Sequence, residues 1–170
     1  MKSMISYNCL RSLKVLITGA ALTLSFVTIG GGEVWAKSKS QIITQQIQTL
    51  QQSNQRWIQI DLSKQRLIAW EGATQMYAVA ISTGKKSTPT LTGTFKIQSK
   101  HRKVRMRGDD YDIPNVPYAM FYDGNYGIHG ADWHRKFGTP VSHGCINVAV
   151  NHAKWLFNWA PMGTSVVIQR

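Results

Sequence analysis

Short β-type runs separated by turn residues fill the chain from Trp57 onward, and this texture limits the fold more than any other feature. The runs WIQIDL and QRLIAW alternate apolar and polar residues around a short turn, which predicts a β-hairpin. Further strands are predicted at MYAVAIST, GTFKIQSK and TSVVIQ, and two aromatic-rich strands flank the turn DGN. Many short strands with one or two helices predict a mainly β sandwich or irregular barrel.

One helix is predicted near the C-terminus, in the run NHAKWLFNW. His152, Trp155, Leu156 and Trp159 fall on one helical stripe, and Asn151 is placed to cap the start.

The Gln-rich segment 37–56 leaves two alternatives open. Ile43, Ile47 and Leu50 have helical spacing, which indicates a short amphipathic helix. The polar bias of the segment slightly favours a solvated tether or linker instead. The catalytic or binding domain is predicted to follow it, over residues 57–170.

The N-terminus has the pattern of a secretory signal peptide. Lys2, Arg11 and Lys14 are followed by an uncharged apolar run of 17 residues, with no acidic residue before it. Small or modest side chains at 34–36 predict cleavage after Ala36, so that residues 1–36 are removed. An uncleaved membrane anchor is the alternative, because such a run is near the lower length limit for a spanning helix. Both alternatives place the rest of the chain outside the cytoplasm.

The expected mature chain is strongly basic. After Ala36 it has 17 basic and 7 acidic residues, a formal charge of +10. Such a surface attracts anions, and export points to wall polymers, anionic lipid or carboxylate-bearing substrates rather than nucleic acid. Lys103, Arg105 and Arg107 alternate, so an extended chain puts them on one face, either as a solvated edge strand or as a surface that attracts substrate.

Cys145 is the only cysteine expected in the mature chain, because Cys9 precedes the apolar run and leaves with the signal peptide. It is therefore a reactive thiol, an intermolecular partner or a buried small residue. A thiol attacks only as the thiolate, so a reactive Cys145 needs help to lose its proton. In SHGCIN, Gly144 allows a tight turn, and neighbouring N–H groups could converge into an oxyanion hole.

Two histidines are candidates for the base that serves Cys145. His143 is tied to the same turn, whereas catalytic cysteine and histidine partners usually come from separate segments. In NYGIHG, alternation along a strand turns His129 away from the apolar face, so that it can face a cleft. The Gly130 carbonyl could hold its second ring nitrogen, and Asp132, expected in a loop, is the nearest acidic candidate for a third member.

Two other interpretations of these residues stay open. His129, His134, His143 and His152 fall with Cys145 in a short stretch, which allows a zinc site, although the spacing fits no familiar ligand pattern. Alternatively, each histidine satisfies hydrogen bonds in its own loop or helix. The second interpretation is the one that we favour for His134 and His152.

The segments from WIQIDLSKQRLIAW through STGKKSTPTLTGTFKI and YGIHGADWHRKFGTPVSHGCINV to GTSVVI resemble the L,D-transpeptidases, with their YkuD-like catalytic domain. The resemblance implies that Cys145 is the nucleophile, His129 the general base and the Gly130 carbonyl its orienting group. His143, Gly144 and Cys145 would form the oxyanion hole. Ser142 and Asn147 match motif positions that hold this turn together, and Trp133 would lie in the substrate cleft. The resemblance implies that these three residues bind the substrate.

The activity implied by this resemblance is acyl transfer on peptidoglycan in the periplasm or cell wall. Cys145 would attack the third residue of a tetrapeptide stem and expel the terminal D-Ala, and a neighbouring stem or a wall-attached protein would accept the acyl group. Neither metal nor other cofactor is required, and a membrane is a partner only if the N-terminal segment is uncleaved. The alternatives are an L,D-carboxypeptidase, in which water is the acceptor, and a non-catalytic wall-binding or zinc-binding module.

Overall fold

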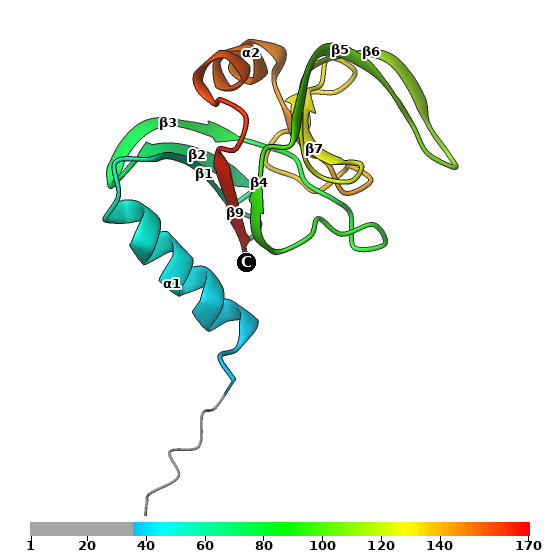
Figure 1. Cartoon of the computed structure of the whole chain (residues 1–170). Coiled ribbons are helices and arrows are strands. Elements are labelled where there is room, and N and C mark those ends of the chain that lie inside the picture. The colour runs from blue at the N-terminus through cyan, green and yellow to red at the C-terminus, as the bar shows by residue number, and fades with distance from the viewer. Residues whose placement is uncertain (1–35) are drawn as a thin grey trace, which may run out of the picture. The chain divides into compact units, whose positions relative to one another are not determined.

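A computed structural model of the chain describes residues 36–170 (Figure 1). Residues 1–35 of the predicted signal peptide, with its 17-residue apolar run, lie outside the described residues. Within the described range, no helix is both long and apolar enough to cross a membrane.

Two sheets and two helices make up the described part of the chain, which confirms the prediction of a mainly β fold. The five-stranded sheet has the order β3-β2-β1-β9-β4, with bounds β1 Arg56–Asp61, β2 Arg66–Glu71, β3 Thr74–Ala80, β4 Gly93–Lys96 and β9 Ser165–Gln169. The four-stranded sheet has the order β5-β6-β7-β8, with bounds β5 Ser99–Arg107, β6 Asp112–Asp123, β7 Tyr126–Gly130 and β8 Ile146–Val148.

The predicted hairpin is present as the antiparallel pair β1 and β2, with Ile58 opposite Ala69. The last strand, β9, does not lie at an edge: it pairs parallel with β1 and antiparallel with β4. Ile58 and Ile60 of β1 and Val166 and Ile168 of β9 alternate onto the face that carries the main core.

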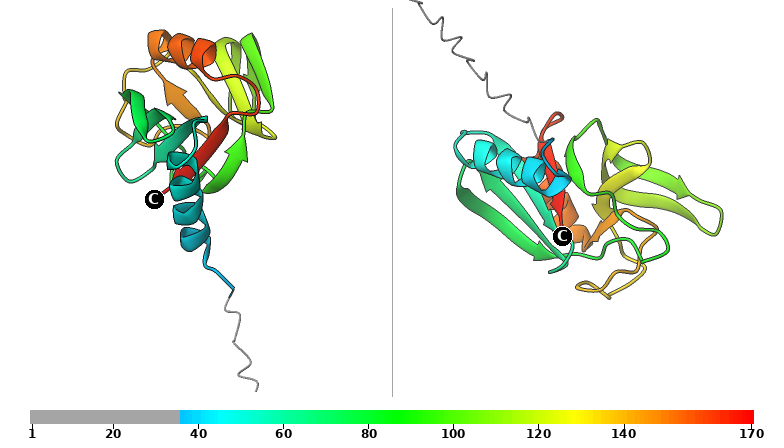
Figure 2. Two further views of the ribbon diagram at one scale, coloured as in Figure 1. Left: turned by 60° about the vertical axis from the view of Figure 1, so that its left-hand side comes forward. Right: turned by 90° about the horizontal axis from the view of Figure 1, so that it is seen from below.

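Segment 37–56 contains the helix α1 (Lys39–Gln51), so the slight preference for a tether is corrected. A capping box starts the helix, because the Ser38 side chain accepts from the Gln41 N–H and the Gln41 side chain accepts from the Ser38 N–H. Ile43 and Leu50 are buried against Trp57 and Val167 on the second face of the five-stranded sheet. The helix lies beside β9 (Figure 2), so this segment is part of the folded domain.

The helix α2 (Val150–Trp159) confirms the predicted C-terminal helix and packs against β6 and β7 (Figure 1). Its N-cap is Ala149, with no side-chain cap, so the expectation that Asn151 caps the helix is wrong. Ala153 and Leu156 are buried in the main core. The helix therefore stabilises β7, which together with its neighbour β8 carries the candidate site.

Two strands bring the distant ends of the candidate site together. β7 and β8 pair in parallel, with His129 opposite Asn147. Isolated bridges join Ser82 to Asn147 and Gly84 to Ser142, so the loop after β3 lies along the segment that contains Cys145.

Candidate active site

Within the turn that carries Cys145, the buried Ser142 side chain makes two hydrogen bonds with the backbone. Ser142 Oγ donates to the Cys145 carbonyl oxygen at 2.5 Å and accepts from the Gly144 N–H at 3.1 Å. Gly144 has φ +116°, and a Cβ there would lie 2.7 Å from Tyr126 Cε1. The turn therefore requires glycine before Cys145 both for its backbone conformation and for space.

Residues of the loop between β3 and β4 form hydrogen bonds with the backbone of the same turn. The Ser142 N–H donates to the Thr83 carbonyl at 3.0 Å, and Thr88 Oγ1 donates to the Ser142 carbonyl at 3.1 Å. Thr90 Oγ1 donates to the Gly144 carbonyl at 2.8 Å. Sequence reasoning assigned no role to these threonines, and the one signal for them was their repetition in STGKKSTPTLTG.

His129 lies on β7 and is 3% exposed. Its Nδ1 is 3.0 Å from the Gly130 carbonyl oxygen. A carbonyl only accepts, so Nδ1 carries the proton and Nε2 is the free, basic nitrogen. The orienting partner is thus a backbone carbonyl, as the sequence suggested, whereas Asp132 is exposed and makes no hydrogen bond with His129.

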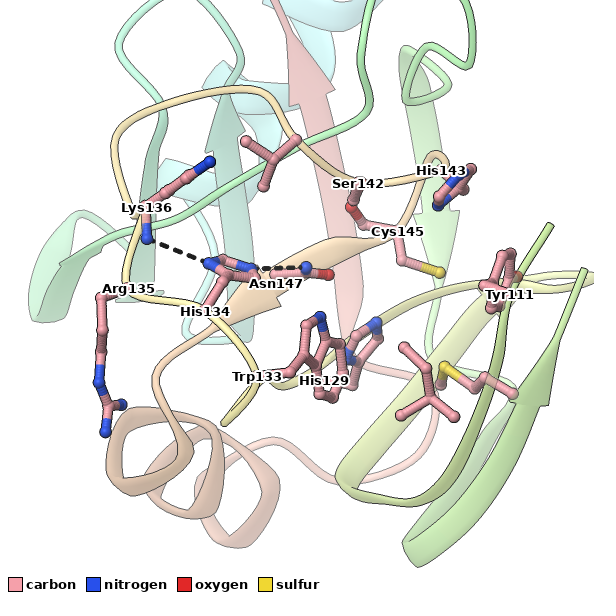
Figure 3. Close-up of a pocket in the computed structure, with 13 residues that line it drawn as sticks. Tyr111, His129, Trp133, His134, Arg135, Lys136, Ser142, His143, Cys145 and Asn147 are labelled. Carbon is pink, nitrogen blue, oxygen red and sulfur yellow. Dashed lines mark hydrogen bonds between the residues drawn. The ribbon is translucent and has the colours of Figure 1, made fainter.

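A cavity of about 560 Å³ brings the predicted residues together. His129, Cys145, Ser142 and Asn147 lie on one side of it, and Trp133 stands at its rim, 41% exposed (Figure 3). The Trp133 ring is 5.8 Å from the His129 ring, centroid to centroid.

The opposite wall comes from the hairpin of β5 and β6, which sequence reasoning did not connect with the site. Met106, Tyr111 and Ile113 line the cavity from this hairpin. Lys103, Arg105 and Arg107 are exposed on β5, and Asp112 forms ion pairs with Arg105 and Arg107. β5 is the edge strand of its sheet, so these side chains fit the solvated edge predicted as one alternative.

The imidazole of His129 and the thiol of Cys145 are both neutral in the resting site. Burial lowers the pKa of His129 to about 4, although its bond with Gly130 partly opposes this shift. Burial also raises the pKa of the Cys145 thiol, partly offset by the Gly127 N–H. The half-buried thiol donates to the Asn125 carbonyl at 3.4 Å. The site therefore holds a thiol and an unprotonated imidazole, and Figure 3 shows both side chains turned into the cavity.

His143 does not face the sulfur as a base would. Its Nε2 is 2.9 Å from Asp110 Oδ2 and 3.3 Å from Lys85 Nζ, and its ring stacks on Tyr111 at 4.9 Å. The hairpin tip thus engages His143 beside Cys145.

Of the three backbone N–H groups predicted to form an oxyanion hole, one already donates to another group. The Gly144 N–H is occupied by Ser142 Oγ, which corrects the expectation that it is a free donor. Within residues 36–170, the backbone N–H groups of His143 and Cys145 make no hydrogen bond, so these two remain as donors.

The remaining histidines separate in space. His152 lies on α2, and its Nδ1 is hydrogen-bonded to the Tyr77 hydroxyl at 2.7 Å. His134 lines the cavity and contacts the Asn147 amide. Among residues 36–170, no three His, Cys, Asp or Glu side chains converge in a way that could hold a metal ion.

The family model of YkuD, the L,D-transpeptidase catalytic domain, matches residues 55–168. The chain belongs to this family.

Related proteins agree with the assignment of the YkuD domain. L,D-transpeptidase 2 of Mycobacterium tuberculosis is 30% identical over 100 residues, which cover 51% of this chain and 24% of that protein. The solved catalytic domain of the E. faecium L,D-transpeptidase superposes with a TM-score of 0.62 at 31% identity, covering 68% of this chain and 98% of that one. The crystal structure of a mutant Enterococcus faecium L,D-transpeptidase superposes with a TM-score of 0.65 at 29% identity, and the match covers 69% of this chain and 50% of that one.

Proposed function

We propose that the protein is an exported cysteine L,D-transpeptidase that acts on peptidoglycan tetrapeptide stems through a thioester on Cys145. One observation carries the proposal: the Cys145 thiol and the free Nε2 of His129 face the same cavity. His129 lies on β7, and Cys145 directly precedes β8, which pairs with β7 in parallel. Membership of the YkuD family supports the reaction class. The basic charge and the signal-like N-terminus support action in the periplasm or wall.

The first half-reaction transfers the stem to the enzyme. His129 Nε2 takes the thiol proton as sulfur attacks the carbonyl carbon of the third stem residue, and a C–S bond forms. The backbone N–H groups of His143 and Cys145 donate to the developing oxyanion. The C–N bond to the terminal D-Ala then breaks, and the leaving nitrogen takes the proton from His129.

The second half-reaction frees the enzyme. An amine of a neighbouring stem or of a wall-attached protein attacks the thioester carbonyl, giving up a proton to His129. The C–S bond breaks and the proton returns to sulfur. If water attacks instead, the same residues act as an L,D-carboxypeptidase, which is the second candidate function.

Other lining residues bind the stem in this proposal. Trp133 offers its exposed ring as an apolar contact, and Asn147 offers its side-chain amide. Ser142 acts by holding the turn. Arg135 and Lys136 also line the cavity, so a stem carboxylate meets positive charge there.

The test is intact-protein mass spectrometry of the purified full chain after incubation with a tetrapeptide muropeptide or with imipenem. The unsubstituted protein is expected to gain one covalent adduct, Cys145→Ala none, and His129→Ala an adduct only at a rate lowered by about 10²-fold or more. His101→Ala, an exposed histidine on β5, is the matched control. An adduct that persists in Cys145→Ala would overturn the proposal, as would an unchanged rate in His129→Ala.

Chromatography of the muropeptide products separates the two candidate functions. A dimer linked through the third stem residue indicates transpeptidation, whereas a tripeptide alone indicates carboxypeptidase activity.

A further inference from the structure

His134 is fixed by two contacts at the cavity wall. Its Nδ1 accepts the Lys136 backbone N–H at 3.1 Å. Its Nε2 lies 3.0 Å from the side-chain amide of Asn147. The Asn147 side chain thus depends on a ring that is itself held by the backbone.

The first contact determines the second. A backbone N–H can only donate, so Nδ1 of His134 is unprotonated, and a neutral imidazole then carries its proton on Nε2. Burial, with the nearby charge of Lys136, lowers the pKa of His134 and favours this neutral form. Nε2–H therefore requires an acceptor.

The acceptor has to be the amide oxygen of Asn147. Figure 3 shows the amide nitrogen toward His134, but two N–H groups cannot bond to each other. A half-turn about the Cβ–Cγ bond exchanges oxygen and nitrogen with almost no change of shape, so hydrogen bonding decides the orientation. In the orientation that satisfies His134, the NH₂ group is at the far end of the amide.

Among the described residues, no donor reaches that far end of the amide. Asn147 is 4% exposed, and the oxygen that Figure 3 draws there is buried and accepts no hydrogen bond. Asn147 lines the cavity, opposite His129 on the parallel strand, and the free end is turned toward Cys145 (Figure 3). Buried polar groups are nearly always satisfied, so an unpaired one at a cavity wall indicates a partner that arrives with the ligand.

We infer that His134 is a positioning residue, which holds the Asn147 amide so that its NH₂ group donates to an oxygen of the bound stem peptide beside the scissile bond. The inference rests on the proposed function and deepens it, because it assigns Asn147 the role of a donor rather than an acceptor. It also gives His134 a task beyond its own loop. The partner is a carbonyl or carboxylate oxygen of the acyl donor.

The experiment measures the rate of Cys145 acylation by a tetrapeptide muropeptide in the full chain. Asn147→Asp is the decisive variant, because it keeps an acceptor for His134 and removes the donor. We expect Asn147→Asp and Asn147→Ala to lower the rate about 10²-fold, as for the loss of one donor at a reacting centre. We expect His134→Ala to lower it about tenfold. His134→Gln, which keeps a side-chain N–H donor, should restore part of that loss.

A double variant separates positioning from a general loss of structure. Adding His134→Ala to Asn147→Ala should cause no further loss, because His134 acts through Asn147. Thermal unfolding of each variant checks the fold, and His101→Ala is again the control. The inference is overturned if Asn147→Asp keeps the parent rate, if His134→Ala changes the rate less than twofold, or if the two losses add. If the unsubstituted chain forms no adduct at all, the proposed function fails instead.

Discussion

Thr90 and Gly144, 54 residues apart, are joined by a hydrogen bond of 2.8 Å from Thr90 Oγ1 to the Gly144 carbonyl oxygen. The same hydroxyl accepts the Gly84 N–H at 2.9 Å. The residue before the proposed nucleophile is thus fixed by a loop far away in sequence. The position of the sulfur depends on this loop as much as on the turn itself.

Gly144→Ala is expected to slow acylation strongly, because the new Cβ meets the Tyr126 ring and the turn has to shift. A displacement of about 1 Å at a reacting group lowers the rate on the order of 10²-fold. Gly138→Ala is the matched control, since Gly138 also has a positive φ, +96°, but open space around it. It should lose about 1–3 kcal/mol of unfolding free energy and keep its acylation rate. Equal rates for the two variants would contradict the clash.

The Cys145 thiol is expected to react slowly with iodoacetamide at neutral pH, because burial raises its pKa above the ordinary range. The alkylation rate should climb as the pH rises, with a midpoint above that of free cysteine. Rates measured from pH 6 to 10 on the unsubstituted chain provide the check. A midpoint below pH 7 would show a preformed thiolate paired with an imidazolium, and the neutral resting state would be wrong.

The unfolding free energy is expected to fall between about pH 6.5 and pH 4, partly through His129. The folded ring has a pKa of about 4, against an ordinary 6.5, so in this range the unfolded chain binds a proton that the folded chain does not. Stability is therefore complete above pH 6.5 and decreases toward pH 4, by about 3 kcal/mol from this group. Urea unfolding of the parent and of His129→Gln measures the difference. Parallel pH profiles for the two proteins would contradict it.

Leu50→Ala is expected to destabilise the domain by about 2–4 kcal/mol, because Leu50 of α1 is 3% exposed against Trp57 and Val167. Ile42→Ala on the same helix should change stability by less than about 0.5 kcal/mol, since Ile42 is 53% exposed. Chemical denaturation of both variants is the measurement. A tether would make the two substitutions equally harmless.

The sequence was sufficient for features with local patterns. Alternation predicted the β1–β2 hairpin, and the helical stripe predicted α2. His129 was preferred to His143 as the partner of Cys145 because it comes from a separate segment of the chain. The contact of His143 with Asp110 agrees with that preference.

Features that depend on contacts between residues far apart in the sequence were not predicted. The Gln-rich composition concealed that α1 is stabilised by Trp57 and Val167, which are apolar residues outside the segment. The threonines that clamp Ser142 and Gly144 have no local signature, because their partners lie 54 residues away. The occupied Gly144 N–H likewise depends on the conformation of the turn rather than on residue identity.

The parallel register of His129 and Asn147 divides the site into a fixed part and an exchangeable part. The backbone at both ends of the intervening loop is held by the pairing of β7 with β8, and α2 packs against β7. The 12 residues between His129 and Ser142 include the cavity residues Trp133, Arg135 and Lys136. Substitution of the exposed Arg135 can therefore alter which stems are accepted, whereas Gly130 and His134 of the same loop have to be kept for the proposed chemistry.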